Sequence, residues 1–229
     1  MTLLEKGASL IDTFSEEFAM PVIDSLDFQQ ILLHPTQTYE EGLLFFRGAG
    51  LMNQTLRQLA KDLEDRKIDY AVIGGVALNQ HGYRRFTEDI DLLLTQQGLL
   101  KFASELIGRG YRPAFEGAVR KFRATAENIP IEILITGDFP GDGKPKSVAF
   151  PDPFENTIEI DGIRTITLPK LVELKLASGS TGAGRRRDLA DVQELIRTLK
   201  LDKPFAEQLD GSVQAIYFEL LGELEDTVY

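Results

Sequence analysis

Residues 70–92 read YAVIGGVALNQHGYRRFTEDIDL, and the pattern of apolar residues changes twice within them. The first four residues form a short apolar run, which is typical of a buried strand. The pair Gly74-Gly75 ends this run, and a helix over 76–80 is expected to start directly after it. A second apolar run, 90–94, predicts a second strand. The segment is therefore expected to fold as strand, helix and strand.

The two glycines stand where a ligand could approach the backbone. Glycine has no side chain to keep a ligand away, and the free N–H groups at the start of a helix attract phosphate. Gly74 and Gly75 are therefore predicted to bind the phosphates of a ligand.

Two aspartates, Asp89 and Asp91, lie at the head of the second strand with one apolar residue between them. Because side chains alternate across a strand, both carboxylates are expected on the same face, roughly 7 Å apart along the backbone. Hard divalent cations such as Mg²⁺ prefer oxygen ligands of this kind. The pair predicts a metal site, and the alternative is a solvated polar face on an edge strand.

A third carboxylate, Glu132, lies within the apolar run 129–135, where a buried strand would carry a hydrophobic residue. A carboxylate buried there needs a partner or a metal, because burying it alone is costly. Glu132 is therefore a candidate to complete the metal site, and a salt bridge inside the sheet is the alternative. Asp138, at the exit of the same strand, is a rival third carboxylate.

The remaining pattern predicts an α/β (α+β) fold, a mixed sheet flanked by helices with helical N- and C-terminal extensions. Asp161-Gly162 suits a tight hairpin turn, and Thr167 and Pro169 suit the first turn of a helix. We expect a loop over 137–153, a flexible joint over 179–184, strands over 119–125, 131–136, 158–160 and 163–166, and helices over 51–67, 97–109, 167–178, 185–200 and 212–225. The expected divisions are an N-terminal helical extension (1–60), a core (61–166) and a C-terminal helical region (167–229).

The composition excludes several kinds of site. The chain has 229 residues, no cysteine and two histidines, so disulfides, thiolate metal sites and a three-histidine metal site are excluded. No apolar run approaches the roughly 20 residues that a membrane helix needs. The N-terminal residues do not resemble a secretory signal, and we expect a cytoplasmic protein without membrane contact.

The net charge of −11 is unevenly distributed. Residues 1–60 and 201–229 are acidic, whereas 109–123 carries five basic side chains and one acid, and 185–187 is an arginine triplet. A polyanionic partner such as RNA is therefore compatible with the sequence, because the local field matters more than the total charge. The alternative is that these basic residues lie on solvated faces and pair with nearby acids.

The spacing from the glycine pair to Arg85-x-Thr87-x-Asp89-x-Asp91 resembles the nucleotidyltransferase superfamily related to polymerase β. The resemblance is closest to the abortive-infection toxins of the AbiE type, and it covers about residues 68–200. In those toxins a helix with a lysine follows, and then a helix with two basic and two acidic residues. The matching residues in this sequence are Lys175, Arg185, Arg187, Asp188 and Asp191.

The resemblance implies an Mg²⁺-dependent transfer of a nucleoside monophosphate from a nucleoside triphosphate to an acceptor hydroxyl. It implies two Mg²⁺ ions on Asp89, Asp91 and Glu132, which also act as the catalytic residues. The implied nucleotide-binding residues are Gly74, Gly75, Arg85, Thr87, Lys175, Arg187 and Asp188.

The partners follow from the same resemblance. The acceptor is expected to be tRNA or other RNA, or a protein, and a cognate antitoxin is an expected partner of a toxin. Two other classes stay open. The fold could serve as a non-catalytic nucleotide- or protein-binding module, and the same carboxylates could serve a metal-dependent hydrolase.

Overall fold

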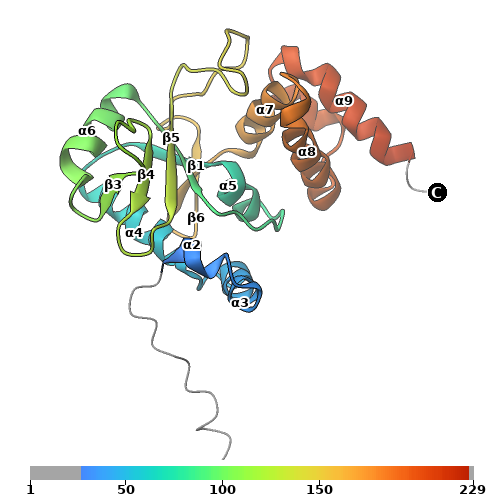
Figure 1. The fold of residues 1–229 in the computed structure, drawn as a ribbon. Coiled ribbons are helices and arrows are strands. Elements are labelled where there is room, and N and C mark those ends of the chain that lie inside the picture. The colour runs from blue at the N-terminus through green and yellow to red at the C-terminus, as the bar shows by residue number, and fades with distance from the viewer. Residues whose placement is uncertain (1–26, 227–229) are drawn as a thin grey trace, which may run out of the picture.

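The computed structural model describes residues 27–226, which form a mixed sheet covered by helices on both faces (Figure 1). The strand order is β3-β4-β5-β2-β1-β7-β6. The pairs β2–β5 and β1–β7 are parallel and the other neighbours are antiparallel, as a mixed sheet requires. The bounds are β1 Tyr70–Ile73, β2 Ile90–Leu94, β3 Tyr111–Pro113, β4 Lys121–Ala124, β5 Pro130–Ile135, β6 Thr157–Ile160 and β7 Ile163–Ile166.

The helices follow the predicted order, with shifts of a few residues at their ends. They are α2 Phe28–Ile31, α3 Pro35–Phe46, α4 Leu51–Asp65, α5 Gly74–Gln80, α6 Gln96–Leu106, α7 Leu168–Gly179, α8 Arg186–Leu199 and α9 Gly211–Asp226, with 3₁₀ turns η1 Ala183–Arg185 and η2 Lys203–Gln208. None of the helices within 27–226 is long and apolar enough to cross a membrane. Residues 1–26 of the expected N-terminal extension lie outside the described residues.

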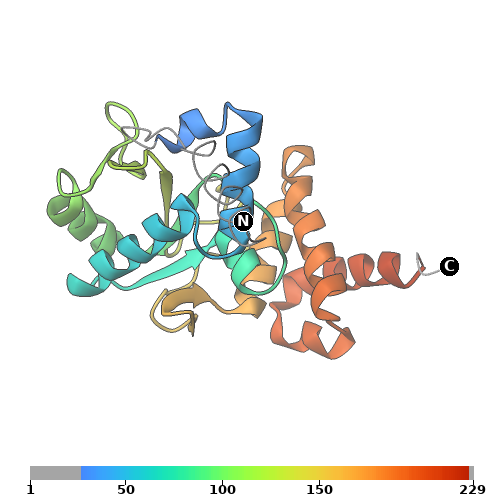
Figure 2. The same cartoon turned by 90° about the horizontal axis from the view of Figure 1, so that it is seen from below.

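Alternating side chains of the central strands build two separate cores. Val72, Leu92 and Leu94 face α4 and α6, while Ala71 and Leu93 face α5 and the C-terminal helices. Figures 1 and 2 both show α7, α8 and α9 gathered at one end of the molecule, away from α6. Side-chain alternation therefore puts Asp91, one residue from Leu92, on the face that meets α7.

The hairpin between β6 and β7 confirms the turn predicted from Asp161-Gly162. Both residues have positive φ, 51° and 75°, the conformation for which Asp-Gly turns are selected. Thr167 stands at the N-cap of α7 with Pro169 in the first turn, as predicted, but its side chain makes no capping hydrogen bond.

Residues 97–113 depart from the prediction. The expected helix over 97–109 ends at Leu106, and the short strand β3 follows and pairs with β4. Gly108 and Gly110 both have positive φ, which stops α6 from continuing and lets the chain turn back into β3. The expected strand over 119–125 is shorter, because residues 114–120 form the loop between β3 and β4.

A candidate active site between the sheet and the C-terminal helices

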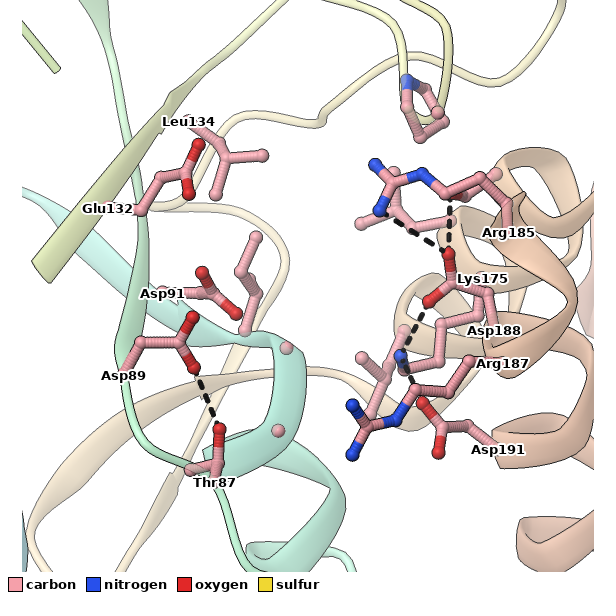
Figure 3. A pocket seen from close by; sticks show the side chains of 18 of the residues that line it. Thr87, Asp89, Asp91, Glu132, Leu134, Lys175, Arg185, Arg187, Asp188 and Asp191 are labelled. Atoms are coloured by element: carbon pink, nitrogen blue, oxygen red, sulfur yellow. Dashed lines mark hydrogen bonds and ion pairs between the residues drawn. The ribbon is translucent and has the colours of Figure 1, made fainter. Parts of the chain in front are cut away.

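The sheet register brings the predicted carboxylates together. Asp91 pairs with Ile73 of β1 on one side and with Glu132 of β5 on the other. Asp89 directly precedes β2, two residues before Asp91. Figure 3 shows the carboxylates of Asp89, Asp91 and Glu132 pointing into one cavity. Residues more than 40 positions apart in the chain thus meet on two neighbouring interior strands of the sheet.

The cavity has a volume of about 360 Å³ and separates the acids from a basic wall on α7 and α8 (Figure 3). The loop over 137–153 also contributes to its lining, a role that no pattern in the sequence predicted. All ten of the sequence-predicted site residues line this cavity: Gly74, Gly75, Arg85, Thr87, Asp89, Asp91, Glu132, Lys175, Arg187 and Asp188.

The two glycines make room for functional side chains. Gly74 has φ +62°, and a Cβ built on it would lie 1.8 Å from Oδ2 of Asp91. A Cβ on Gly75 would lie 2.6 Å from Oγ1 of Thr87. The turn after β1 therefore needs glycine because any side chain there would collide with Asp91 or Thr87. The sequence analysis predicted these glycines from phosphate binding alone and did not anticipate this packing.

Thr87 holds the side chain of Asp89 in place by a hydrogen bond. The Thr87 side chain is buried, and its Oγ1 donates a hydrogen bond of 2.8 Å to Oδ1 of Asp89. One carboxylate oxygen of Asp89 is thereby fixed, while the other is left for a ligand. This contact gives Thr87 a positioning role beside the role in nucleotide binding that the resemblance implies.

The carboxylate cluster has an excess of negative charge. Burial, together with the charges of Asp89 and Glu132, raises the pKa of Asp91 to about 7, against the opposing effect of Lys175 and Arg85. Carboxylates that repel one another in this way bind a divalent cation favourably, because the cation removes the repulsion.

The same acids fit a magnesium ion that shares its ligands with a nucleotide. Within residues 27–226, no three or more histidine, cysteine, aspartate or glutamate side chains are arranged so that they could hold a metal ion by themselves. Mg²⁺ does not require such an arrangement, since it commonly takes one or two carboxylates together with substrate phosphates and water. Asp89 and Asp91 provide those two carboxylates.

Glu132 differs from its prediction in one respect. Its side chain is 43% exposed, so the expected burial among hydrophobic residues is wrong. The reason is strand alternation, because Ile131, Ile133 and Ile135 fill the core while Glu132 faces the cavity. The Nζ atom of Lys121 on β4 lies 3.5 Å from Oε2 of Glu132.

The rival carboxylate, Asp138, points elsewhere. It forms an ion pair with Arg120 and does not line the cavity. Glu132 is therefore the better placed of the two candidates for a third catalytic carboxylate.

The facing wall is a network of paired charges centred on Lys175. Its Nζ lies 2.7 Å from Oδ2 of Asp191 and 3.0 Å from Oδ1 of Asp188, and Lys175 itself is buried. Arg85 reaches across from the sheet side and bonds Asp191 through Nη1 at 2.7 Å. Asp191 thus joins the two halves of the site, a role that the sequence reasoning missed although the residue stood in the motif.

Asp188 is held in its charged form. Burial alone would raise its pKa, but Lys175, the Ser178 hydroxyl and Arg185 together hold the pKa of Asp188 below its usual value. Oγ of Ser178 donates to Asp188 over 2.7 Å. Ser178 also lines the cavity, and no motif in the sequence pointed to it.

Arg187 is the cation with the least engagement on this wall. It is exposed, it lines the cavity, and it forms no ion pair with any carboxylate within residues 27–226. Its charge is therefore available to an anionic ligand.

Solved structures of similar fold come from several sources. ANT(2″)-Ia in complex with adenylyl-2″-tobramycin is 12% identical, with 72% of this chain and 96% of that chain covered and a TM-score of 0.49. A nucleotidyltransferase-like protein from Paracoccidioides brasiliensis is 17% identical, with coverages of 76% and 87% and a TM-score of 0.48. The JHP933 protein from Helicobacter pylori is 17% identical, with coverages of 68% and 69% and a TM-score of 0.41.

No curated protein matches the sequence. Because these three TM-scores are below 0.5, the family assignment rests on a family model instead. The model described as "Nucleotidyl transferase AbiEii toxin, Type IV TA system" matches residues 55–218, which contain the sheet, the carboxylates and the basic wall. The chain is therefore a nucleotidyltransferase that belongs to the AbiEii family.

Proposed function

We propose that this protein transfers a nucleoside monophosphate from a nucleoside triphosphate to an acceptor hydroxyl, with Mg²⁺ held by Asp89 and Asp91. The observation that carries the proposal is the cavity with three carboxylates on one wall and Lys175 and Arg187 on the other. A triphosphate needs positive charge around its phosphates, and a metal-assisted transfer needs carboxylates beside the reacting phosphorus.

Each wall has a separate task in this proposal. Bound Mg²⁺ neutralises phosphate charge and lowers the pKa of the acceptor hydroxyl. Glu132, which is partly exposed beside Asp91, is available to accept the proton of that hydroxyl. Thr87 orients Asp89, and Arg187 binds the phosphates that leave as pyrophosphate. Lys175 fixes Asp188 and Asp191 on the wall that faces the acids.

We further propose that the acceptor is an RNA and that the reaction makes the protein a toxin. Lys121, which pairs with Glu132, brings the basic stretch over 109–123 to the edge of the cavity. Arg109, Arg112 and Arg123 of that stretch form no ion pair within residues 27–226. RNA phosphates are attracted to such a surface. A growth-inhibiting transferase needs a cognate antitoxin, which is the protein partner that the family name implies.

The test uses each nucleoside triphosphate, labelled at the α-phosphate, with Mg²⁺ and either total cellular RNA or total cellular protein. Label is expected in the RNA fraction, and EDTA is expected to abolish it. Asp89→Asn is expected to lower the rate by at least about 100-fold, because it removes a metal ligand. The matched control is Glu88→Gln, an adjacent exposed acid outside the cavity, which is expected to keep full activity.

The outcomes separate the classes of function. Triphosphate binding without release of pyrophosphate would favour a binding module, and free labelled monophosphate without a labelled acceptor would favour a hydrolase. Label in protein alone would overturn the RNA acceptor but not the transfer. Wild-type turnover by Asp89→Asn would contradict the site itself.

A further inference from the structure

A second cavity lies between the N-terminal helices and the sheet. Its volume is about 360 Å³, and residues of α3, α4, α5 and the β6–β7 hairpin line it. None of its lining residues lines the catalytic cavity. It is therefore a separate site, to which the proposed transfer reaction gives no role.

Positive charge converges on this cavity from three segments. Arg47 follows α3, Arg57 belongs to α4 and Arg84 lies in the loop after α5. Asp161 is the one carboxylate among the lining residues. None of the three arginines forms an ion pair with a carboxylate in the described part of the chain, and Arg57 donates to the carbonyl oxygen of Gly48. Three guanidinium groups against one carboxylate favour an anionic ligand.

The rest of the lining suits a ligand that also carries a ring or another apolar group. The apolar lining residues include Phe45, Phe46, Met52 and Leu56. Asn53 also lines the cavity, and its buried Oδ1 has no hydrogen-bond partner within residues 27–226. The buried Glu41 carboxylate accepts from the backbone N–H of Met52 instead, and it does not line the cavity.

We propose that this cavity binds the phosphate group of a nucleotide unit, either a free mononucleotide or one residue of an RNA strand. The guanidinium groups of Arg47, Arg57 and Arg84 bind the phosphate, and the apolar wall beside Asn53 receives the base or the sugar. Arginine is suited to this task, because its planar fork of donors matches phosphate oxygens.

The position of the cavity links it to the catalytic one. Asn79 lines the second cavity, and its side chain accepts from the Arg85 N–H and donates to the carbonyl oxygens of Gly75 and Arg85. Gly75 and Arg85 both line the catalytic cavity. A nucleotide unit in the second cavity would therefore lie beside Asn79, whose side chain bonds backbone groups of Gly75 and Arg85 in the catalytic cavity.

The test measures binding in EDTA, so that no transfer reaction is required and a failure of the proposed function does not affect it. The probes are adenosine 5′-monophosphate and a short single-stranded RNA, with adenosine as the control without phosphate, and titration calorimetry gives the dissociation constants. Arg47→Ser/Arg57→Ser is expected to weaken binding of a phosphate-bearing probe by at least about tenfold, because two charged hydrogen-bond donors are lost.

The matched control removes the same charge outside the cavity. Lys61→Ser/Lys203→Ser, two exposed lysines outside both cavities and outside the basic stretch, is expected to leave affinity within about twofold of the wild type, since distant surface charge is screened at physiological salt. Arg84→Ser, a single change in an exposed loop, tests the site without risk to a helix and is expected to weaken binding several-fold.

Loss of affinity for the mononucleotide assigns the site to free nucleotide, and loss confined to the RNA assigns it to the strand. Equal losses in the cavity variant and in the charge-matched control would overturn the proposal. So would unchanged affinity in both arginine variants, or the absence of saturable binding of either phosphate-bearing probe to the wild type.

Discussion

Gly74 brings the turn after β1 close to the carboxylate of Asp91. Gly74→Ala would force its new Cβ into the space of the Asp91 carboxylate, 1.8 Å from Oδ2. Asp91 would have to turn away from Asp89, and we expect kcat to fall by about 100-fold or more, as displaced catalytic groups commonly cause. Steady-state transfer kinetics on the folded variant measure this loss.

A second glycine separates the effect of the clash from that of backbone strain. Gly162 has a similar φ of 75°, but a Cβ built on it would meet nothing within 4 Å. Gly162→Ala is expected to cost about 1 kcal/mol of stability, as other residues do in left-handed conformations, and to retain activity. Equal activity losses in the two variants would contradict the role assigned to Gly74.

His81 makes stability depend on pH. Burial lowers the pKa of His81 from its usual 6.5, and only a hydrogen bond between Nε2 and the Ile166 carbonyl oxygen, 2.7 Å away, opposes this. The folded state therefore takes up a proton less readily than the unfolded state. The stability contributed by neutral His81 is fully present above pH 6.5 and is lost as the pH falls below it.

His81→Gln keeps a hydrogen-bond donor but cannot titrate in this range. We expect the free energy of unfolding of the wild type to fall more steeply than that of His81→Gln between about pH 7 and pH 5. Urea unfolding at several pH values gives both curves. Parallel curves would show that His81 is not responsible for the acid loss.

Local spacing was enough to group residues that the structure places around one cavity. Gly74, Thr87, Asp89 and Asp91 fall within one strand–helix–strand unit, so a short motif indicates all four. Asp191 was harder to select, since its importance depends on contacts with Lys175 and Arg85, and Arg85 lies more than 100 residues earlier in the chain. Such contacts follow from packing and not from spacing.

Helix α7, which contributes Lys175 to the basic wall, is buried along most of its length. All residues from Leu171 to Gly179 are buried, including Lys175 and Glu173. Lys175→Met would leave Asp188 and Asp191 without their shared cation. We expect a loss of about 3 kcal/mol in the free energy of unfolding, because unpaired buried charges are costly, together with weaker triphosphate binding.

Denaturant unfolding and nucleotide titration measure the two effects of Lys175→Met. The control is Lys61→Met on α4, where the lysine is exposed and lines neither cavity. A stability loss of the same size in both variants would mean that the buried network contributes nothing beyond the lysine itself.

Strands and turns with a clear apolar or turn pattern were predicted from the sequence, and short strands without such a pattern were missed. The apolar runs of β1, β2 and β5 and the turn of the β6–β7 hairpin are explicit in the sequence. Strand β3 is only three residues long and contains Pro113, so neither alternation nor propensity marks it. Its pairing with β4 comes from the tertiary fold.

At the scale of the whole molecule, the core on the α7 side of the sheet joins the sheet to the C-terminal helices. Residues of β1, β2 and α5 share a single apolar cluster with α7, α8 and α9. Helix α4 likewise crosses the boundary predicted at residue 60 and packs into the opposite core of the sheet. Separation of 61–166 from 167–229 would expose the apolar face around Ala71 and Leu93.

We therefore expect the full chain to unfold in a single calorimetric transition, with equal calorimetric and van't Hoff enthalpies. A fragment that ends at residue 166 is expected to lack a cooperative transition. Two separate transitions in the full chain would show that the sheet and the C-terminal helices fold independently.

The order of partners along the chain also matters during translation. Lys175 and Glu173 leave the ribosome before Asp188, Asp191 and the Asp210 backbone N–H to which they bond. A nascent chain that already contains Asp89, Asp91 and Glu132 still lacks Asp188 and Asp191, the two carboxylates that pair with Lys175. The ion-pair network around Lys175 can therefore form only after α8 has left the ribosome.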